Sequence, residues 1–302
     1  MNNLSIPAPL FRDPIYDGPS DPVMIWNRAE KCWWLIYTQR RSTEAAIGVS
    51  NVFGSALGVA SSADGQYWTY RGTIPGLDLD PGHNTFWAPE VVWLNGRYHM
   101  YVTYIQGIQF DWDHGYKPSK LAHFISDDLW HWEFESFSQV SERPVIDACV
   151  HEIAPGQFKM WFKEDNNTYA AVSDDLCRWT PVGCEINDVQ HEGPNVFTLG
   201  GKNWMITDMW HGLAVYSTED FTHWTRQPEN ILEQPGTRPG DQLVGHHADV
   251  LMNNGHAYII YFTHKAEGSW STQLQAAELL VEDGKLVCHR DRPQTWDLIP
   301  EI

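Results

Sequence analysis

Apolar residues are grouped along this chain in short β-branched and aromatic runs that are separated by turn residues. A short apolar run, a turn and an aromatic-rich run recur five times, at residues 21–38, 88–104, 147–164, 193–210 and 248–264. The turns contain pairs such as Asn95-Gly96 and Gly200-Gly201, which favour β-hairpins. Helical periodicity is nearly absent, so the pattern predicts an all-β fold.

A second repeat places an Asp four residues before a Trp. The four pairs are Asp64 and Trp68, Asp128 and Trp132, Asp175 and Trp179, and Asp220 and Trp224. The tryptophans are 64, 47 and 45 residues apart, and the first interval holds an insertion near residues 107–120. Intervals of about 40–50 residues are typical of one four-stranded propeller blade. We therefore predict a five-bladed β-propeller, with four-stranded antiparallel blades around a central axis, in a single domain of residues 1–302.

The repeated Asp and Trp residues have a structural interpretation. A Trp that recurs at one position of a blade is expected to pack between blades, and the Asp before it is expected to cap backbone N–H groups in a turn. We therefore do not count these residues among the catalytic candidates.

The charge balance disfavours some classes of binding partner. The chain has 39 acidic and 20 basic residues, a formal net charge of −19 at pH 7. Such a charge repels phosphate backbones and anionic lipids, so nucleic-acid and membrane partners are disfavoured. The 16 tryptophans suit the stacking of neutral sugars as well as a β core. An oligosaccharide is the expected partner, and the sequence does not specify an oligomeric state.

Cysteines and the N-terminal segment bear on the compartment. The five cysteines are odd in number and form no CxxC pair, which argues against a disulfide framework or a zinc site. The first residues lack the basic start and apolar stretch of a signal peptide. We expect a cytoplasmic protein, or a secreted or periplasmic one if a signal peptide has been removed.

In a propeller, the innermost strand of every blade starts near the axis. The five starts are Ser20-Asp21-Pro22, Trp87-Ala88-Pro89, Ile146-Asp147-Ala148, Glu192-Gly193-Pro194 and His247-Ala248-Asp249. The hairpins repeat while these residues differ, as expected for a shared scaffold with distinct chemical roles. Glycoside hydrolysis needs two carboxyl groups beside the bond, and a third can raise the pKa of the acid. Asp21, Asp147 and Glu192 meet this need if they converge, although an Asp at such a position is also a common turn residue.

The ordered motifs SDPVMIW, WAPEVVWLNGRYHMYV, VIDACVHE, HEGPNVF and GHHADV resemble glycoside hydrolase family 43 and its five-bladed relatives of families 117 and 32, over residues 12–290. The resemblance implies that Asp21 is the general base, Glu192 the general acid and Asp147 the residue that tunes the acid. It implies inversion at the anomeric carbon, and no required cofactor. It also makes His247 the axial histidine, beside which a structural calcium or sodium ion is one option.

Two alternatives for the catalytic roles stay open. Asp13, in Arg12-Asp13-Pro14, competes with Asp21, which we prefer because an apolar strand follows it directly. His191 and His246 each adjoin a proposed site residue. In the related anhydro-galactosidase propellers a histidine is thought to be the acid, so a histidine acid remains an alternative here.

Substrate contacts are expected from residues near the five strand starts. The candidates are Trp87, Glu90, Asn84, Trp210, His211 and His191. For each of them, packing within the protein is the competing interpretation. The insertion around Trp112 and residues 111–114 is expected to form a rim that blocks one end of the pocket, which would make the enzyme exo-acting.

We therefore expect an exo-acting, inverting hydrolase of neutral plant or algal oligosaccharides, of the α-L-arabinofuranosidase or β-xylosidase type. The alternatives are an anhydro-galactosidase or galactosidase on the same scaffold, and a non-catalytic carbohydrate-binding propeller. The intact carboxylate trio argues against the last. A retaining fructosidase-type propeller and a glycoside phosphorylase are disfavoured, because their signature residues and their basic phosphate clamp are not evident.

Overall fold

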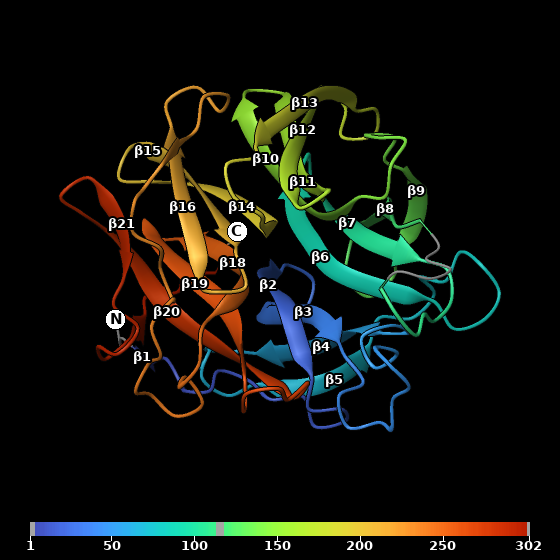
Figure 1. Cartoon of the computed structure of the whole chain (residues 1–302), viewed down its shortest axis with the longest axis horizontal. Coiled ribbons are helices and arrows are strands. Elements are labelled where there is room, and N and C mark those ends of the chain that lie inside the picture. Colours follow the sequence, from blue (N-terminus) through green and yellow to red (C-terminus); the bar gives the residue numbers. More distant parts are fainter. Residues whose placement is uncertain (1–3, 113–117, 301–302) are drawn as a thin grey trace.

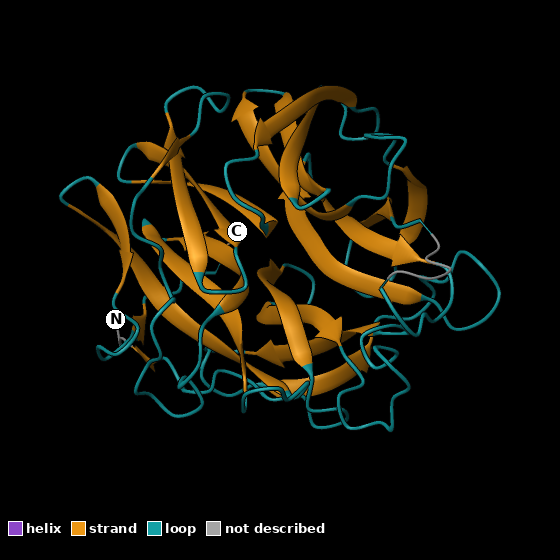
Figure 2. Ribbon diagram, viewed as in Figure 1, coloured by secondary structure: helices purple, strands orange, loops and turns teal. Residues whose placement is uncertain are grey.

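The computed structural model describes residues 4–112 and 118–300, which form strands and loops and no helix (Figure 2). Within these residues there is accordingly no helix long and apolar enough to cross a membrane. Five antiparallel sheets of four strands surround one axis, with the first strand of every sheet nearest to it (Figure 1). The predicted five-bladed β-propeller is confirmed.

Each blade uses four consecutive strands. Blade 1 contains β2 (Pro19–Asn27), β3 (Cys32–Gln39), β4 (Ala56–Ser62) and β5 (Thr69–Thr73). Blade 2 contains β6 (Thr85–Leu94), β7 (Arg97–Ile105), β8 (Lys120–Ser126) and β9 (Glu133–Phe137). Blade 3 contains β10 (Ile146–Ala154), β11 (Gln157–Glu164), β12 (Asn167–Ser173) and β13 (Thr180–Ile186). Blade 4 contains β14 (Glu192–Leu199), β15 (Lys202–Asp208), β16 (Leu213–Thr218) and β17 (Thr225–Arg226). Blade 5 contains β18 (His246–Asn253), β19 (His256–His264), β20 (Thr272–Glu282) and β21 (Lys285–Cys288).

The repeated tryptophans pack between neighbouring blades, as predicted. Trp179 of blade 3 makes an edge contact with Tyr101 of blade 2, with the ring centroids 5.8 Å apart. Trp224 of blade 4 contacts Trp161 of blade 3 at 5.9 Å in the same way. The Asp four residues before each repeated Trp accepts hydrogen bonds from backbone N–H groups two and three residues further on. The repeat is therefore structural, and the catalytic candidates lie elsewhere.

A β-bulge interrupts the start of every innermost strand at the same register. The ladder skips two residues between Ser20 and Val23, Trp87 and Glu90, Ile146 and Cys149, Glu192 and Asn195, and His246 and Asp249. The second residue of four of these bulges is left-handed, with φ of +47° at Asp21, +44° at Ala88, +58° at Asp147 and +57° at Gly193. A bulge bends its strand and re-aims a side chain, and here it does so at the axis.

The register corrects the expected start of blade 5 by one residue. His246 pairs with Phe262 on the second strand, as Ser20 pairs with Thr38 in blade 1. His247, rather than Ala248, therefore occupies the position that Asp21 has in blade 1. The sequence does not reveal this shift of one residue, because His246 and His247 are adjacent and either of them could open the strand.

Three of the five bulges are also points of attachment between blades. In three cases the backbone N–H of the bulge donates to a side chain on the second strand of the preceding blade. These pairs are Ala88 N to Thr38 Oγ1 at 2.9 Å, Asp147 N to Thr103 Oγ1 at 3.1 Å, and His247 N to Asp208 Oδ2 at 2.9 Å. Thr38, Thr103 and Asp208 occupy equivalent places, opposite the first residue of their own bulge.

The ring is closed by segments from both ends of the chain. β1 (Leu4–Ser5) pairs with β22 (Thr295–Trp296), outside the five blades. Trp296 is 2% exposed; its indole N–H donates to Gly65 O of blade 1 at 2.9 Å, and its ring contacts Tyr258 of blade 5 at 4.8 Å. Trp296 thus joins the first and last blades.

We expect Trp296→Ala to lower the free energy of unfolding by about 3–5 kcal/mol, because it opens a cavity between blades 1 and 5. Urea denaturation followed by tryptophan fluorescence and circular dichroism measures the change. The control is Tyr67→Ala, at a position that is 79% exposed, for which the change should stay within about 0.5 kcal/mol. Equal effects of the two substitutions would show that the terminal strands do not hold the ring closed.

Candidate active site

A pocket of about 510 Å³ opens at the axis and is lined by residues from all five blades. The three predicted carboxylates line it together: Asp21 from blade 1, Asp147 from blade 3 and Glu192 from blade 4. The sequence places these residues far apart, and the bulges at the strand starts bring them together. Their catalytic roles remain predictions.

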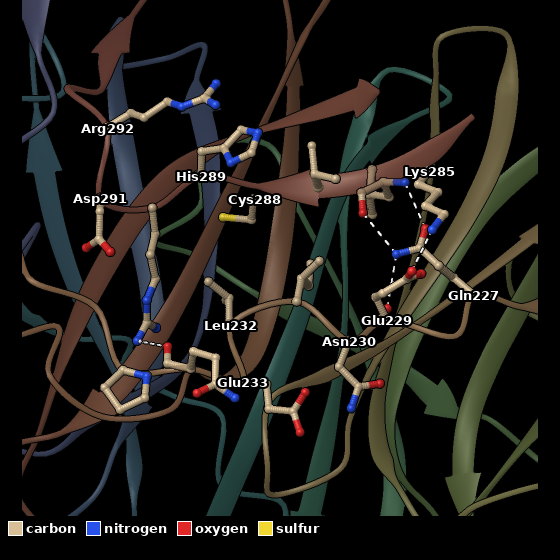
Figure 3. A pocket seen from close by; sticks show the side chains of 16 residues that line it. Gln227, Glu229, Asn230, Leu232, Glu233, Lys285, Cys288, His289, Asp291 and Arg292 are labelled. Atoms are coloured by element: carbon tan, nitrogen blue, oxygen red, sulfur yellow. Dashed lines mark hydrogen bonds and ion pairs between the residues drawn. The ribbon is translucent and has the colours of Figure 1, made fainter. Parts of the chain in front are cut away.

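A larger hollow of about 670 Å³ lies away from the axis, between the ends of blades 4 and 5 (Figure 3). There Gln227 bonds both the N–H and the C=O of Leu286, and Lys285 forms an ion pair with Glu229. The residues that line this hollow include no Trp, Tyr or Phe on which a sugar could stack. The contacts around this hollow therefore join blades 4 and 5, and its lining does not favour a sugar site.

Asp21 is buried and held by three polar neighbours. Its Oδ2 accepts a hydrogen bond from Ser20 Oγ at 3.0 Å. Its Oδ1 lies 3.5 Å from Arg40 Nη2 and 3.5 Å from His247 Nδ1. The Arg40 guanidinium and the His247 imidazole thus face one oxygen of this carboxylate, while its left-handed backbone fixes the direction of the side chain.

The charges of the other two carboxylates, Glu192 and Asp21, both act on the pKa of Asp147. Burial raises its pKa to about 6; the nearby His247 opposes this rise, and Glu192 adds to it. Asp147 Oδ2 also accepts a hydrogen bond from Gly193 N at 3.2 Å. Asp147 therefore holds the backbone directly beside Glu192.

Both carboxylate oxygens of Glu192 have partners. Oε2 forms an ion pair with Lys163 Nζ at 2.8 Å, and Oε1 accepts a hydrogen bond from the indole N–H of Trp210 at 3.0 Å. Lys163 also lies over the Trp210 ring, 5.5 Å from its centroid. Trp210 is left-handed, with φ of +61°, an unusual conformation for a large residue and one that marks a constrained position.

Sequence reasoning missed Asp208, which organises the wall between blades 4 and 5. Its Oδ1 accepts a hydrogen bond from Trp210 N at 2.7 Å. Its Oδ2 accepts one from His247 N at 2.9 Å and faces His246 Nδ1 at 3.3 Å. Burial alone would raise the pKa of Asp208, but the hydrogen bond and charge of His246, together with the backbone hydrogen bonds of His247 and Trp210, hold the pKa below its usual range.

His247 lies at the centre of the carboxylates. Burial disfavours its cation, but the charges of Asp147, Asp21 and Glu192 together outweigh burial and raise its pKa. The ring also covers Gly193, where an added Cβ would lie 3.0 Å from the imidazole. A glycine at 193 thus suits both its left-handed backbone and the place of His247.

The chain does not offer a ready donor set for the axial ion that the family resemblance allows. No three His, Cys, Asp or Glu residues among those described form a group that could hold a metal. The hollow beneath His247 has a volume of about 20 Å³, enough for about one water molecule. We therefore derive no catalytic step through an ion.

Glu90, a predicted substrate contact, lies below the pocket floor and lines that small hollow. Its Oε1 accepts a hydrogen bond from Val150 N at 2.7 Å. Burial, and next the charge of Asp249, raise its pKa to about 8. Asp249 joins three blades, accepting from Met24 N and Asn195 Nδ2 at 3.1 Å each. Glu90 and Asp249 thus link the innermost strands.

The other predicted contacts are divided between the pocket and the scaffold. Trp87 and Trp210 line the pocket. His211 is exposed and lies outside its wall. Asn84 is buried, where it bonds Asp78 and the backbone of Gly107, and His191 is buried against Thr168 and a backbone carbonyl. Neither of these two side chains belongs to the pocket wall, and their polar atoms bond to loop residues for Asn84 and to β12 and a backbone carbonyl for His191.

Asp13, the alternative to Asp21, also belongs to the scaffold. Its Oδ1 accepts hydrogen bonds from two backbone N–H groups, and its Oδ2 accepts from Tyr37 Oη and Gln39 Nε2 at 2.6 and 2.7 Å. The pocket wall does not include it.

One side of the pocket is walled by aromatic rings. Phe53 contacts Trp87 at 4.8 Å and Trp112 at 5.6 Å between centroids. Trp87 is fixed by its indole N–H, which donates to Val52 O at 2.7 Å. Trp112 lies on the predicted rim and is 54% exposed, whereas residues 113 and 114 of that rim lie outside the described residues.

No protein-family model and no curated protein sequence matches the chain. Among solved structures, a thermostable family-43 glycoside hydrolase is 17% identical, with a TM-score of 0.67, and the match covers 97% of this chain and 99% of that one. CoXyl43, a β-xylosidase/α-arabinofuranosidase from a compost microbial metagenome in complex with xylotriose, is 14% identical, with a TM-score of 0.70 and coverage of 94% and 97%. The β-1,3-galactosidase BT3683 with galactodeoxynojirimycin is 12% identical, with a TM-score of 0.67 and coverage of 93% and 96%. The chain has the five-bladed fold of the family 43 glycoside hydrolases.

Glu90 should give the stability of the protein a distinctive pH dependence. With a pKa near 8 when folded and an ordinary value when unfolded, it keeps a proton in the folded state that the unfolded chain has released. Between about pH 5 and about pH 8 its contribution therefore lowers the free energy of unfolding as pH rises, by at most about 1.4 kcal/mol per pH unit.

The Glu90→Gln variant should lack this contribution, so it should gain stability relative to wild type as pH rises through that range. Urea denaturation at several pH values measures the difference. Glu142→Gln, at an exposed loop position, is the control and should follow wild type. A constant difference between Glu90→Gln and wild type would contradict the burial of a protonated Glu90.

Proposed function

We propose that this chain is an exo-acting, inverting glycoside hydrolase that removes a terminal pentose, as an α-L-arabinofuranosidase or β-xylosidase, from neutral oligosaccharides. The observation that supports it most is the convergence of Asp21, Asp147 and Glu192 in one axial pocket. Two carboxyl groups beside one bond are what glycoside hydrolysis needs, and a binding module has no need for them.

In the proposed reaction, Asp21 takes a proton from the attacking water and Glu192 gives its proton to the departing oxygen. Lys163, 2.8 Å from Glu192 Oε2, stabilises the carboxylate that remains after the proton has left. Arg40 and His247 contact Asp21 Oδ1 and fix the position of this carboxylate for the proton transfer. Asp147, through Gly193 N, fixes the backbone that carries the acid.

A neutral sugar suits the remaining walls. Trp87 and Trp112 offer aromatic faces for the apolar side of a sugar ring. The net charge of −19 disfavours strongly anionic polysaccharides. The preference for a pentose rests on the resemblance to family 43 and on the similarity to a β-xylosidase/α-arabinofuranosidase.

A galactosidase or anhydro-galactosidase is the second candidate, and one observation favours it. His246 lines the pocket and faces Asp208 Oδ2 at 3.3 Å, an arrangement that orients an imidazole for proton transfer. In this alternative His246, in place of Glu192, protonates the leaving group.

Product release from nitrophenyl arabinofuranosides, xylosides and galactosides by wild type, Asp21→Asn, Glu192→Gln and His246→Ala tests the proposal. Asp21→Asn should lower kcat/KM by about 10²–10⁴-fold, the range for loss of a general base. Glu192→Gln should lower kcat/KM less on these substrates than on oligosaccharides, because a nitrophenolate leaving group needs little help from an acid. Proton NMR of the first product should show the inverted anomer.

Three outcomes would contradict the pentosidase. Turnover of galactosides that depends on His246 and survives Glu192→Gln would favour the second candidate. Sugar binding by calorimetry without any turnover would leave a carbohydrate-binding propeller. Retention of the anomeric configuration would exclude the water-activating role of Asp21.

A further inference from the structure

Asp208 occupies a place in the blade repeat where a threonine is sufficient to join two blades. The equivalent residues of blades 1 and 2 are Thr38 and Thr103, and their hydroxyl groups accept the bulge N–H of the next blade at 2.9 and 3.1 Å. In blade 4, Asp208 Oδ2 accepts His247 N in the same way at 2.9 Å. Burying a carboxylate costs more than burying a hydroxyl group, and Asp208 is only 1% exposed. The attachment of blade 5 alone therefore does not account for an aspartate here.

The second oxygen of Asp208 has a partner that the two threonines lack. Oδ1 accepts a hydrogen bond from Trp210 N at 2.7 Å, in the turn between β15 and β16. Such a bond, from an Asp side chain to the backbone two residues further on, stabilises a turn. Trp210 has a φ of +61°, which is uncommon for a large residue and persists only where neighbouring groups fix it. Asp208 Oδ1 is one of the groups that fix it.

Trp210 in turn holds the proposed acid. Its indole N–H donates to Glu192 Oε1 at 3.0 Å, while Lys163 holds Oε2 at 2.8 Å. Glu192 lies directly opposite Asp208 in the pairing of β14 with β15, so the three residues are neighbours at one end of blade 4. The direction of the Glu192 carboxyl group therefore depends on the backbone of Trp210, and that backbone depends on Asp208 Oδ1.

The first oxygen of Asp208 leads to the proposed base. Oδ2 holds the backbone of His247, and His247 Nδ1 lies 3.5 Å from Asp21 Oδ1. Because the two oxygens belong to one rigid planar group, Asp208 is connected to the acid and to the base through one intermediate residue each. An inverting hydrolase needs a defined separation of its two carboxyl groups, since a water molecule must fit between one of them and the sugar.

We propose that Asp208 is a positioning residue of the hydrolase: Oδ1 fixes Glu192 through Trp210, and Oδ2 fixes Asp21 through His247. This inference rests on the proposed function. It adds that the placement of the acid relative to the base is set by a residue that acts through its neighbours rather than on the reacting atoms.

Asp208→Thr tests the connection to the acid. Its single hydroxyl oxygen replaces the bond to His247 N, as in blades 1 and 2, and leaves Trp210 N without its partner. On an oligosaccharide of the sugar selected by the nitrophenyl panel, such as xylobiose for a xylosidase, kcat should fall by about 10–100-fold, because a displaced catalytic group costs up to about that much. On the nitrophenyl glycoside kcat should stay within about threefold of wild type, because its leaving group needs little help from an acid.

Trp210→Phe tests the route, because it removes the indole N–H and keeps an aromatic ring. Adding Asp208→Thr to Trp210→Phe should cause little further loss of kcat on the oligosaccharide, since both changes break the same connection. Losses that multiply would overturn the route through Trp210 and point instead to His246, which Asp208 Oδ2 also faces at 3.3 Å.

His211→Ala, at the exposed neighbour of Trp210 in the same turn, is the matched control and should leave both substrates near wild type. Circular dichroism checks that each variant is folded, and Asp208→Ser, which carries the same hydroxyl group, replaces Asp208→Thr if the latter does not fold. Loss of both substrates by the same factor, or of neither, would overturn the positioning role while the hydrolase stands. If wild type cleaves neither substrate, the hydrolase and the positioning role fall together.

Discussion

The bulge at the start of each innermost strand is the constraint on which both the ring and the pocket depend. Four of its central residues adopt positive φ, three of them non-glycine, and such residues persist only where their surroundings fix them. For Ala88 and Asp147 the fixing comes from the preceding blade, whose second strand accepts their backbone N–H, and the bulge of blade 5 is held in the same way through His247 N. The hydrogen bonds that hold neighbouring blades together therefore also aim the side chains at the axis.

Charge is balanced locally although the protein as a whole is strongly acidic. Asp21 faces Arg40 and His247, Glu192 faces Lys163, and Asp208 faces His246. Buried carboxylates without such partners would be strongly disfavoured. At the positions where blades 1 and 2 have threonines, blade 3 has Lys163 and blade 4 has Asp208, so a structural position of the repeat has been given a charge where the pocket needs one.

The hairpins and the blade interval could be predicted from the sequence, because turn residues and repeated Asp and Trp residues are local signals. The place of Asp21, Asp147 and Glu192 at the axis could be predicted because they open the innermost strands. Asp208 and Lys163 could not, because they lie on second strands and their place at the axis follows from register. Their place in the repeat is the signal that could have found them. Counted from the bulge centre of the blade, it is the same to within two residues, 15–17 residues, for Thr38, Thr103, Lys163 and Asp208. Glu90 and Asn84 are near Trp87 in sequence, but the bulge turns Glu90 beneath the floor and loop bonds hold Asn84 away.

The pairing of Leu4–Ser5 with Thr295–Trp296 has a consequence for how the protein is made. Synthesis on the ribosome proceeds from the N-terminus, so the first blades emerge long before the strand that will latch them. Until blade 5 and β22 are released, the apolar face of blade 1 that packs against blade 5 is uncovered, and such exposed surface favours intermolecular association. Contacts of such long sequence separation also form slowly. The nascent open ring is therefore the species on which a chaperone, or an aggregate, would act.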